Sequence, residues 1–573
     1  MPKLPNSRAA AVSKFEQESV DHQTLLAKLG VRTSQGAFYT PLDVAERLAD
    51  TALRDAIKRM RRPEDSPRVL DATCGTGSFL VAAALRISDR LVELGMSQVD
   101  ALKYAVSNCL FGTDIDTTAA EICRHNLAAL SLKPSCVVDL SEHILAVDSL
   151  RLFLLGGGRA GQGSLFDEPE RTWADTFPEV FSGEDPGFDA VIGNPPFLNQ
   201  LESETSLSTD LATALVDRYG ESLSKLTNTA SIFMLGASEI VKVSGVVTLI
   251  QPISFLATRE SNEIRRLLLQ RRSLQELWFG GGGIFDAAVE VVGVTLGPKQ
   301  SSGSTQISIG RNFNNGGHVD SPSANDKTWS RPLARAKGVP KCAFTSGGVV
   351  GDFAEATADF RDQYYGLVGV VKDLRDSENQ SGLLRLATVG LIDLARFMWG
   401  ERPTKFAKDN FTRPVVDPKV LPEKLRSWAL ARAVPKVIVS NQTKILEVYV
   451  DVAGDILPSV PLLTVDCEIK QLWLVAAAIA SPVATIVAAE RHLGAGMSVE
   501  VLKLSAKDVL GLHVPSDNEA WLKGAEILNH LQERKHQANR TALLTTFASE
   551  MNSAYGVSDS GIVDWWLSRF PKR

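Results

Sequence analysis

Apolar residues along the chain gather in short runs that stop abruptly, and longer stretches with a helical repeat separate them. The runs at 69–71, 110–116 and 188–192 are compact enough for buried strands, and each carries at its end an acid, or glycine and proline. Residues 42–61 have the amphipathic spacing of a helix, and a long helical region covers 81–107. Strands that alternate with helices predict an α/β fold built on a Rossmann-like sheet.

The third run stops at Gly193 and continues as Asn194-Pro195-Pro196-Phe197. Proline has no N–H to donate to a sheet, and the residue before a proline is held extended, so these residues form a stiff loop at the carboxyl end of the strand. Ligands of open α/β sheets bind at that end. The Asn194 amide oxygen and the Pro195 carbonyl can accept the two hydrogens of an exocyclic amino group while Phe197 stacks on its ring. The alternative is a Pro-Pro turn with a core phenylalanine.

The first run leads into a glycine loop. Asp71 ends the strand, Gly75 and Gly77 allow the backbone to turn closely under a ligand, and residues 78–80 open a helix. A dinucleotide site would carry a third glycine and hold a phosphate at the helix N-terminus. This loop lacks that glycine, and its acid can hold an ammonium group instead.

Charge and cysteine content narrow the classes of protein. The 573 residues carry a net charge of −6, which argues against a surface that is basic throughout, so a nucleic-acid partner would need a local basic cluster. Residues 401–450 supply one, with ten basic residues against five acids, although a solvated charged face would look the same. The six cysteines form no Cys-x-x-Cys pair, which predicts reduced thiols in a cytoplasmic, nucleoid-associated protein. The chain has no long apolar run, so we expect no membrane segment.

Three motifs, taken together, resemble those of a known family. Gly36-Ala37-Phe38-Tyr39-Thr40-Pro41 precedes the glycine loop, Asp71-Ala72-Thr73-Cys74-Gly75-Thr76-Gly77 forms it, and Asn194-Pro195-Pro196-Phe197 follows. Their order over residues 34–300 resembles that of gamma-class N6-adenine DNA methyltransferases of restriction-modification systems. The resemblance implies S-adenosylmethionine as cofactor, double-stranded DNA as partner, no metal, and transfer of a methyl group to N6 of an adenine flipped out of the duplex.

The resemblance also assigns roles to individual residues. The catalytic loop is Asn194, Pro195, Pro196 and Phe197, with Phe197 and Phe285 against the substrate base. Residues implied to bind the cofactor are Phe38, Tyr39, Thr40, Asp71, Cys74, Gly75, Gly77, Asp114, Ile115, Asp148 and Asn194. Asp116 stays open as an alternative to Asp114 for the ribose, and a solvated acidic turn is the alternative to both. Asp148 is expected to accept a hydrogen bond from the adenine amino group of the cofactor. This expectation depends on an Asp-Ser-Leu turn, which is a common sequence.

The domain organisation follows from composition and motif position. We expect a helical arm at 1–34 and the methyltransferase domain at 35–300. A Ser/Gly/Asn-rich linker is expected at 301–330, and a mixed α+β target-recognition, DNA-binding domain at 331–573. Thr40 is expected to cap the helix that starts at Leu42.

Two other functions stay open at this point. Related Asn/Ser-Pro-Pro-aromatic loops occur in enzymes that methylate cytosine N4, guanine N2 of ribosomal RNA, or protein glutamine. A non-catalytic DNA-binding subunit on the same fold is the second alternative. The recognition sequence, and whether separate restriction or defence-system subunits join the chain, cannot be read from the residues.

Overall fold

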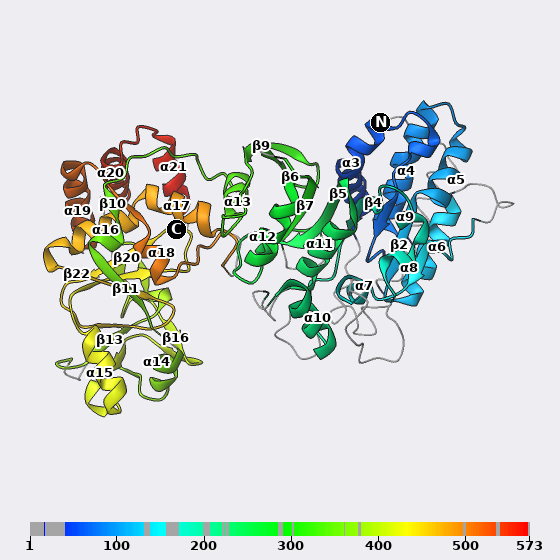
Figure 1. Ribbon diagram of the computed structural model, residues 1–573. Helices are drawn as coiled ribbons and strands as arrows, with labels where there is room; N and C mark the ends of the chain where they lie inside the picture. The colour runs from blue at the N-terminus through cyan, green and yellow to red at the C-terminus, as the bar shows by residue number, and fades with distance from the viewer. Residues whose placement is uncertain are drawn as a thin grey trace. The chain divides into compact units, whose positions relative to one another are not determined.

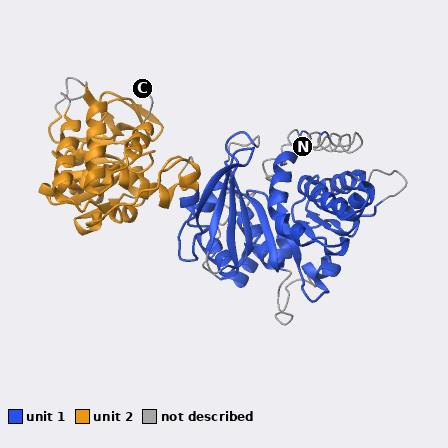
Figure 2. Ribbon diagram, turned by 90° about the horizontal axis from the view of Figure 1, so that it is seen from above, with its two compact units in different colours: residues 1–332 blue, residues 333–573 orange. Residues whose placement is uncertain are grey.

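The computed structural model divides the chain into two compact units, Met1–Pro332 (unit 1) and Leu333–Arg573 (unit 2) (Figure 2). It describes the single residues 17, 24 and 223 and the ranges 40–130, 138–155, 171–198, 207–220, 228–284, 290–300, 303–359, 361–375, 380–496, 500–533 and 539–570. The helical arm expected at 1–34 therefore lies almost wholly outside the described residues.

Within the described residues, unit 1 is built on a nine-stranded sheet of order β3-β2-β1-β4-β5-β7-β6-β8-β9 (Figure 1). Its strands are β1 Val69–Asp71, β2 Leu110–Asp114, β3 Ile144–Ala146, β4 Phe188–Gly193, β5 Val241–Pro252, β6 Arg272–Phe279, β7 Val291–Pro298, β8 Ser304–Ile309 and β9 Asn314–Asp320. The first five strands are parallel, and β7 runs antiparallel between β5 and β6. The predicted α/β, Rossmann-like sheet is confirmed.

The strand order reverses at β1. The chain moves outward from β1 to β2 and β3, and then returns to place β4 on the other side of β1, so that Val69 pairs with Leu110 on one side and Ala190 on the other. Ligands of open parallel sheets bind outside the carboxyl ends of the strands at such a reversal. Asp71 ends β1 and Gly193 ends β4, so the reversal brings the glycine loop and the proline loop to one point.

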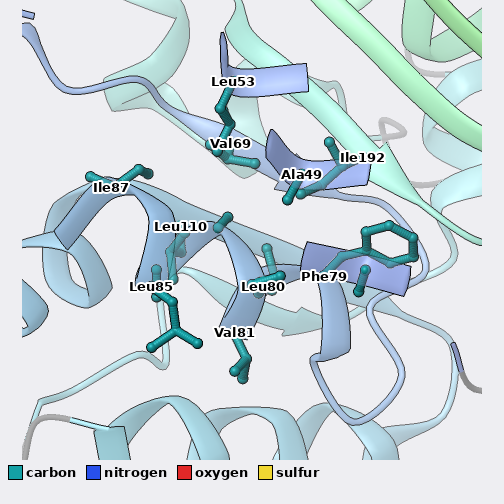
Figure 3. Packing of buried hydrophobic residues seen from close by; sticks show 14 of the residues in the cluster. Ala49, Leu53, Val69, Phe79, Leu80, Val81, Leu85, Ile87, Leu110 and Ile192 are labelled. Carbon is teal, nitrogen blue, oxygen red and sulfur yellow. The ribbon is translucent and has the colours of Figure 1, made fainter. Parts of the chain in front are cut away.

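Helices cover the sheet and close its core. Those described in the first 336 residues are α3 Leu42–Arg59, α4 Ser78–Glu93, α5 Gln98–Asn108, α6 Thr117–Leu130, α7 Ser149–Leu154, α8 Trp173–Thr176, α9 Pro178–Phe181, α10 Thr209–Tyr219, α11 Thr229–Ile240, α12 Asn262–Arg271 and α13 Ser330–Ala336. α3 packs along α4, β4 and β5. Figure 3 shows Ala49 and Leu53 of α3 beside Val69 and Ile192, with Phe79 and Leu80 of α4 in the same fully apolar cluster. This burial fixes the strands whose ends carry the candidate site.

The prediction of a linker at 301–330 is wrong for most of that range. Ser304–Ile309 and Asn314–Asp320 are strands β8 and β9, which extend the sheet beyond β6. Their Ser, Asn and Gly content concealed the alternation of buried residues at Thr305 and Ile307, which forms the inward face of β8. Phe313, in the turn between them, stacks on Trp278 with ring centroids 4.8 Å apart.

Unit 2 mixes helices and strands, as predicted. Its elements are β10 Gly348–Val349, β11 Ala354–Ala358, α14 Arg361–Gly366, β12 Lys372–Asp373, β13 Leu384–Ala387, β14 Ile392–Asp393, β15 Arg396–Phe397, β16 Thr404–Phe406, β17 Asp409–Phe411, β18 Pro414–Val416, α15 Glu423–Arg432, β19 Lys436–Ser440, β20 Glu447–Asp451, β21 Ile456–Pro458, β22 Leu463–Cys467, α16 Leu472–Ala480, α17 Pro482–His492, α18 Ala506–Leu510, β23 His513–Val514, α19 Asn518–Gln532, α20 Arg540–Ala554 and α21 Gly561–Ser568. One four-stranded sheet has the order β11-β22-β19-β20 and a second the order β12-β18-β13-β21. Among the described residues no single helix has the length and apolar character of a membrane span, although the bent pair Ile469–Ala480 and Pro482–His492 passes by length and composition together.

A buried ion pair joins the start of β19 to the end of β20 in the first sheet of unit 2. Lys436 Nζ lies 2.6 Å from Asp451 Oδ2, and both side chains are almost completely removed from solvent. The Asp451 carboxylate also accepts from the backbone N–H groups of Gly454 and Ile456, each at 3.0 Å. Burial lowers the pKa of Lys436, and the adjacent carboxylate opposes that effect. Lys436 is therefore a core residue, although its place in the basic stretch suggested a surface charge.

We expect Asp451→Asn to destabilise the protein by about 3–5 kcal/mol, because it leaves the Lys436 ammonium buried without its counter-charge. Urea denaturation monitored by circular dichroism measures the loss. The matched control is Glu500→Gln, which breaks the exposed pair with Lys444 and should cost no more than about 1 kcal/mol. Equal losses in the two variants would contradict the role given to burial.

Candidate active site

Asp71 lies at the point where β1, β2 and β4 end. Its side chain is buried, and its Oδ1 accepts a hydrogen bond from the Thr73 N–H at 3.0 Å. A Cβ atom added to Gly193 would lie only 2.6 Å from the same oxygen, so the proline loop begins directly against the carboxyl group. Burial raises the pKa of Asp71 to about 8, and the charge of nearby Asp114 acts in the same direction.

The glycine loop is fastened to the end of β2. Gly75 and Gly77 have φ angles of 51° and 100°, which L-residues with side chains rarely adopt. The Gly75 N–H donates to Asp114 Oδ2 at 2.8 Å, and the Cys74 N–H donates to the Thr113 carbonyl at 2.9 Å. The structure thus brings together Asp71, Cys74, Gly75 and Asp114 as the sequence predicted, although their roles in binding stay predictions.

The two acids after β2 have different surroundings. Asp116 Oδ1 accepts from the N–H groups of Thr118 at 2.9 Å and Ala119 at 3.3 Å, so it caps α6. Asp114 instead faces the glycine loop, and its Oδ1 accepts from the Asp116 N–H. Of the pair left open by the sequence, Asp114 is therefore the one that faces the glycine loop, and its contact with a ribose stays a prediction. Ile115 between them is 70% exposed, an unusual position for a large apolar side chain and one where a flat apolar group could rest.

Asp148 is a helix cap in this structure. Its Oδ1 accepts from the N–H groups of Leu150 at 2.9 Å and Arg151 at 3.3 Å, at the start of α7. The next residue, Ser149, ties this turn to β2 through a 2.6 Å hydrogen bond between its hydroxyl and that of Thr113. The turn is thus held at the same edge of the sheet, and its contact with a cofactor stays a prediction.

The proline loop continues straight out of β4. Pro195 is buried, whereas Asn194, Pro196 and Phe197 are half-buried. Phe197 packs against the apolar cluster of α3, α4 and the sheet. The loop is thereby held in place by its aromatic residue, and Asn194 follows directly on Gly193, which lies against Asp71 at the end of β1.

The segment before α3 is described only from Thr40 onward, so Phe38 and Tyr39 lie outside the described residues, as does Phe285. The predicted cap is wrong: the boundary residue of α3 is Pro41, whose carbonyl accepts from Val44 and Ala45, and Thr40 makes no cap bond. Thr40 is nevertheless buried, and its hydroxyl has no hydrogen-bond partner among the described residues.

Three residues that support the site did not emerge from the sequence. Gly193 permits the close approach to Asp71, and Thr113 holds both the glycine loop and the Ser149 turn. Asn126 is buried on α6 and donates to the Thr76 carbonyl at 3.0 Å. A polar residue on the apolar face of a helix is the signal by which Asn126 could have been found.

The basic stretch at 401–450 is only partly a surface cluster. Besides Lys436, four of its members are engaged within unit 2: Arg402 with Asp393, Arg432 with Asp359, Lys444 with Glu500, and Arg426 with the carbonyls of Pro418, Lys419 and Leu421. Arg413 in addition lies over the ring of Trp399, 5.2 Å from its centroid, so six of the ten residues serve the fold. The partners of Arg432 and Lys444 lie 73 and 56 residues away in the sequence, so the local count of charges could not reveal them.

Two family models match unit 1. Residues 24–135 match the model described as N-6 DNA Methylase, and residues 108–285 match the Eco57I restriction-modification methylase. No curated protein matches the chain. Residues 24–285 are thus similar to DNA methylases of the restriction-modification kind, and S-adenosylmethionine is the cofactor that this likeness implies.

Solved structures resemble the chain at low sequence identity. The Type IIL restriction-modification enzyme MmeI, in complex with DNA, matches with a TM-score of 0.56 and 12% identity over 94% of this chain and 79% of that enzyme. The ATP-dependent Type ISP restriction-modification enzyme LlaBIII, bound to DNA, matches with a TM-score of 0.49 and 12% identity over 90% of this chain and 41% of that one. At this identity the likeness to MmeI shows a shared fold.

We expect Asp71→Asn to stabilise the free protein increasingly as the pH rises from about 4 to about 8. The folded-state pKa of about 8 lies above the unfolded value, so the wild type loses stability across that interval as the unfolded chain alone releases the proton. The neutral amide has no such loss. Urea denaturation at pH 5, 7 and 8.5 measures the gap between the two proteins.

The control for this comparison is Asp55→Asn, which removes an exposed carboxylate from α3. Its stability should follow the pH dependence of the wild type. A constant gap between Asp71→Asn and the wild type at all three pH values would show that the Asp71 carboxyl ionises normally.

Proposed function

We propose that the chain is a site-specific, gamma-class DNA methyltransferase that transfers a methyl group to N6 of an adenine rotated out of duplex DNA. The observation that carries the proposal is the contact between Gly193 and Asp71, because it joins the glycine loop and the Asn-Pro-Pro-Phe loop at the reversal of the sheet. A group held by the first loop is thereby adjacent to a group held by the second.

The residues at the carboxyl ends of β1 and β2 suit S-adenosylmethionine. Asp71 is a buried carboxyl group without an ion pair among the described residues, and an ammonium group there would offset the burial that raises its pKa. Asp114 is placed to receive ribose hydroxyls, since a carboxylate accepts two hydrogen bonds at once. The exposed Ile115 offers an apolar face, and the Thr40 hydroxyl lacks a partner among the described residues. When bound, S-adenosylmethionine supplies an electrophilic methyl group.

The proline loop would hold the amino group that receives it. Asn194 Oδ1 and the Pro195 carbonyl accept the two N6 hydrogens, which draws the nitrogen lone pair out of conjugation with the ring and directs it toward the methyl group. Phe197, fixed by its packing on the core, stacks on the base. The N–C bond to the methyl group would form as the bond from sulfur to that methyl group breaks, and the surplus N6 proton would pass to solvent after transfer. The rate would then come from positioning and from these hydrogen bonds, without a general base. Rotation of the base out of the stack is needed because a paired N6 cannot reach the loop.

Adenine in DNA is favoured over other amino substrates by two features. The motif order of residues 36–197 is that of the gamma class, and one of the matching family models is described as N-6 DNA Methylase. MmeI, whose structure resembles this chain, was solved in complex with DNA. We assign residues 331–573 as the target-recognition domain, on the strength of this likeness and of the residual surface charges in unit 2.

The chemistry is tested by incubating mixed genomic DNA with isotopically labelled S-adenosylmethionine and the full-length protein. Nucleoside digestion and mass spectrometry should find the label in N6-methyldeoxyadenosine. Label in N4-methylcytosine would agree with the fold but would contradict the assignment of adenine as the target base. If the protein binds S-adenosylmethionine but transfers no label to DNA, the substrate would instead be RNA or protein.

We expect Asn194→Ala to lower the methylation rate by at least about a hundredfold, because the amino group loses a hydrogen-bond acceptor at the reacting centre. Binding of S-adenosylmethionine, measured by calorimetry, should be largely retained. The control is Asn108→Ala, which removes an exposed amide from α5 and should leave the rate unchanged. Loss of cofactor binding in Asn194→Ala would show that Asn194 serves the cofactor or that the loop has misfolded, and either result would contradict a role confined to the amino group.

A further inference from the structure

The outward-facing side chains of an exposed β-ribbon in unit 2 have no structural role in the fold. β16 and β17 pair antiparallel, with Thr404 opposite Phe411, Lys405 opposite Asn410, and Phe406 opposite Asp409. Because residues directly opposite one another share a face, Lys405 and Asn410 point to one side and Phe406 and Asp409 to the other.

The inner face of the ribbon is firmly attached. Phe406 is 3% exposed in a cluster with Leu386 and Val416, and Phe411 packs on the same cluster. The Phe406 ring lies 4.7 Å from the Tyr364 ring between centroids. The Ala407 N–H donates to the Tyr364 hydroxyl at 3.1 Å, which fixes the turn as well as the strand. Figure 1 shows β13, β16, α14 and α15 gathered at one end of unit 2.

The outer face is polar and unengaged. Lys405, Lys408 and Asn410 are all exposed, and none of their side chains has a hydrogen-bond or ion-pair partner among the described residues. This distinguishes the two lysines from Lys436 and Lys444, which are paired within unit 2. Asp409, the acid of the ribbon, lies on the opposite face.

The backbone of the ribbon's turn is strained at two residues that are not glycine. Ala407 and Lys408 have φ angles of 48° and 79°, in the left-handed region that two-residue turns usually fill with Asn and Gly. A strained backbone that is held by its surroundings motivates a functional hypothesis for the position. Here the strain places the Lys408 side chain at the tip of the ribbon, where glycine would have none.

We propose that the β16–β17 ribbon contacts duplex DNA through its outer face and reads the target in the major groove. A two-stranded ribbon fits a groove about 12 Å wide. Lys405 and Lys408 contact phosphates, and Asn410 makes a bidentate contact with an adenine edge, the pairing that the geometry of an amide permits. This inference rests on the proposed function, since it specifies how the same enzyme holds and recognises its DNA.

The decisive variant is Lys408→Gly in the full-length protein. Glycine relieves the left-handed strain, so the melting temperature should stay the same or rise. Affinity for sheared, unmethylated plasmid DNA, measured by fluorescence anisotropy, should fall severalfold. The slope of log affinity against log salt concentration should decrease by about one, since one phosphate contact is lost. A loss of binding in a protein that is at least as stable cannot come from misfolding.

Asn410→Ala tests the base contact separately. It should leave the salt slope unchanged. The preference for one base pair of the methylated sequence should fall by about tenfold or more, as mapped by sequencing methylated positions in plasmid DNA. The control variants are Lys470→Ala and Lys523→Ala, which remove the same charge from exposed positions with carboxylate neighbours elsewhere in unit 2. Both should bind and methylate DNA as the wild type does.

The outcomes separate the ribbon from the function on which it depends. If the wild type methylates DNA and the ribbon variants match it in affinity, salt slope and sequence preference, the ribbon proposal is wrong and the enzyme activity stands. If the two control lysines matter as much as Lys408, the effect is one of net charge and the ribbon is again excluded. If the wild type neither binds nor methylates duplex DNA, both proposals fail.

Discussion

The candidate site depends on a buried carboxyl group at the place where the sheet reverses its strand order. Asp71 ends β1, touches the backbone of Gly193 at the end of β4, and is electrostatically coupled to Asp114 at the end of β2. Burial there is costly for a charged group, and no ion pair among the described residues offsets that cost. Such an arrangement gains from a cationic ligand. The apolar packing of α3 and α4 behind the three strands keeps the carboxyl group in this position.

The same reversal explains why the site could be predicted from the sequence. A strand end is marked locally, by an acid, a glycine or a proline, and parallel strands bring their carboxyl ends to one edge. Asp71, Gly75, Asp114 and Asn194 therefore converge as expected. The close approach of Gly193 was not predictable, because it depends on the distance between two strands that are separated by more than a hundred residues in the chain.

Other features were concealed because their causes are non-local. Strands β8 and β9 have the composition of a linker, and only their pairing with β6 and with each other makes them part of the sheet. Asp116 and Asp148 follow strands as ligand-binding acids do, yet both cap helices. In the basic stretch of unit 2, the carboxylates of Asp359, Asp393 and Glu500 neutralise residues that appear unpaired in the sequence. Lys405 and Lys408 of the β16–β17 ribbon are among the residues that remain once the paired ones are removed from the count.

The most direct test of the account is calorimetric titration of the protein with S-adenosylhomocysteine at pH 7, in two buffers of different ionisation enthalpy. This ligand has the amino-acid end of the cofactor and no methyl group to transfer. The Asp71 carboxyl, with a pKa of about 8 in the free protein, should lose its proton when the ammonium group binds, so about one proton should be released per site. The same heat in both buffers would mean that no proton is exchanged, and would contradict the account in which a protonated Asp71 ionises to hold the ligand.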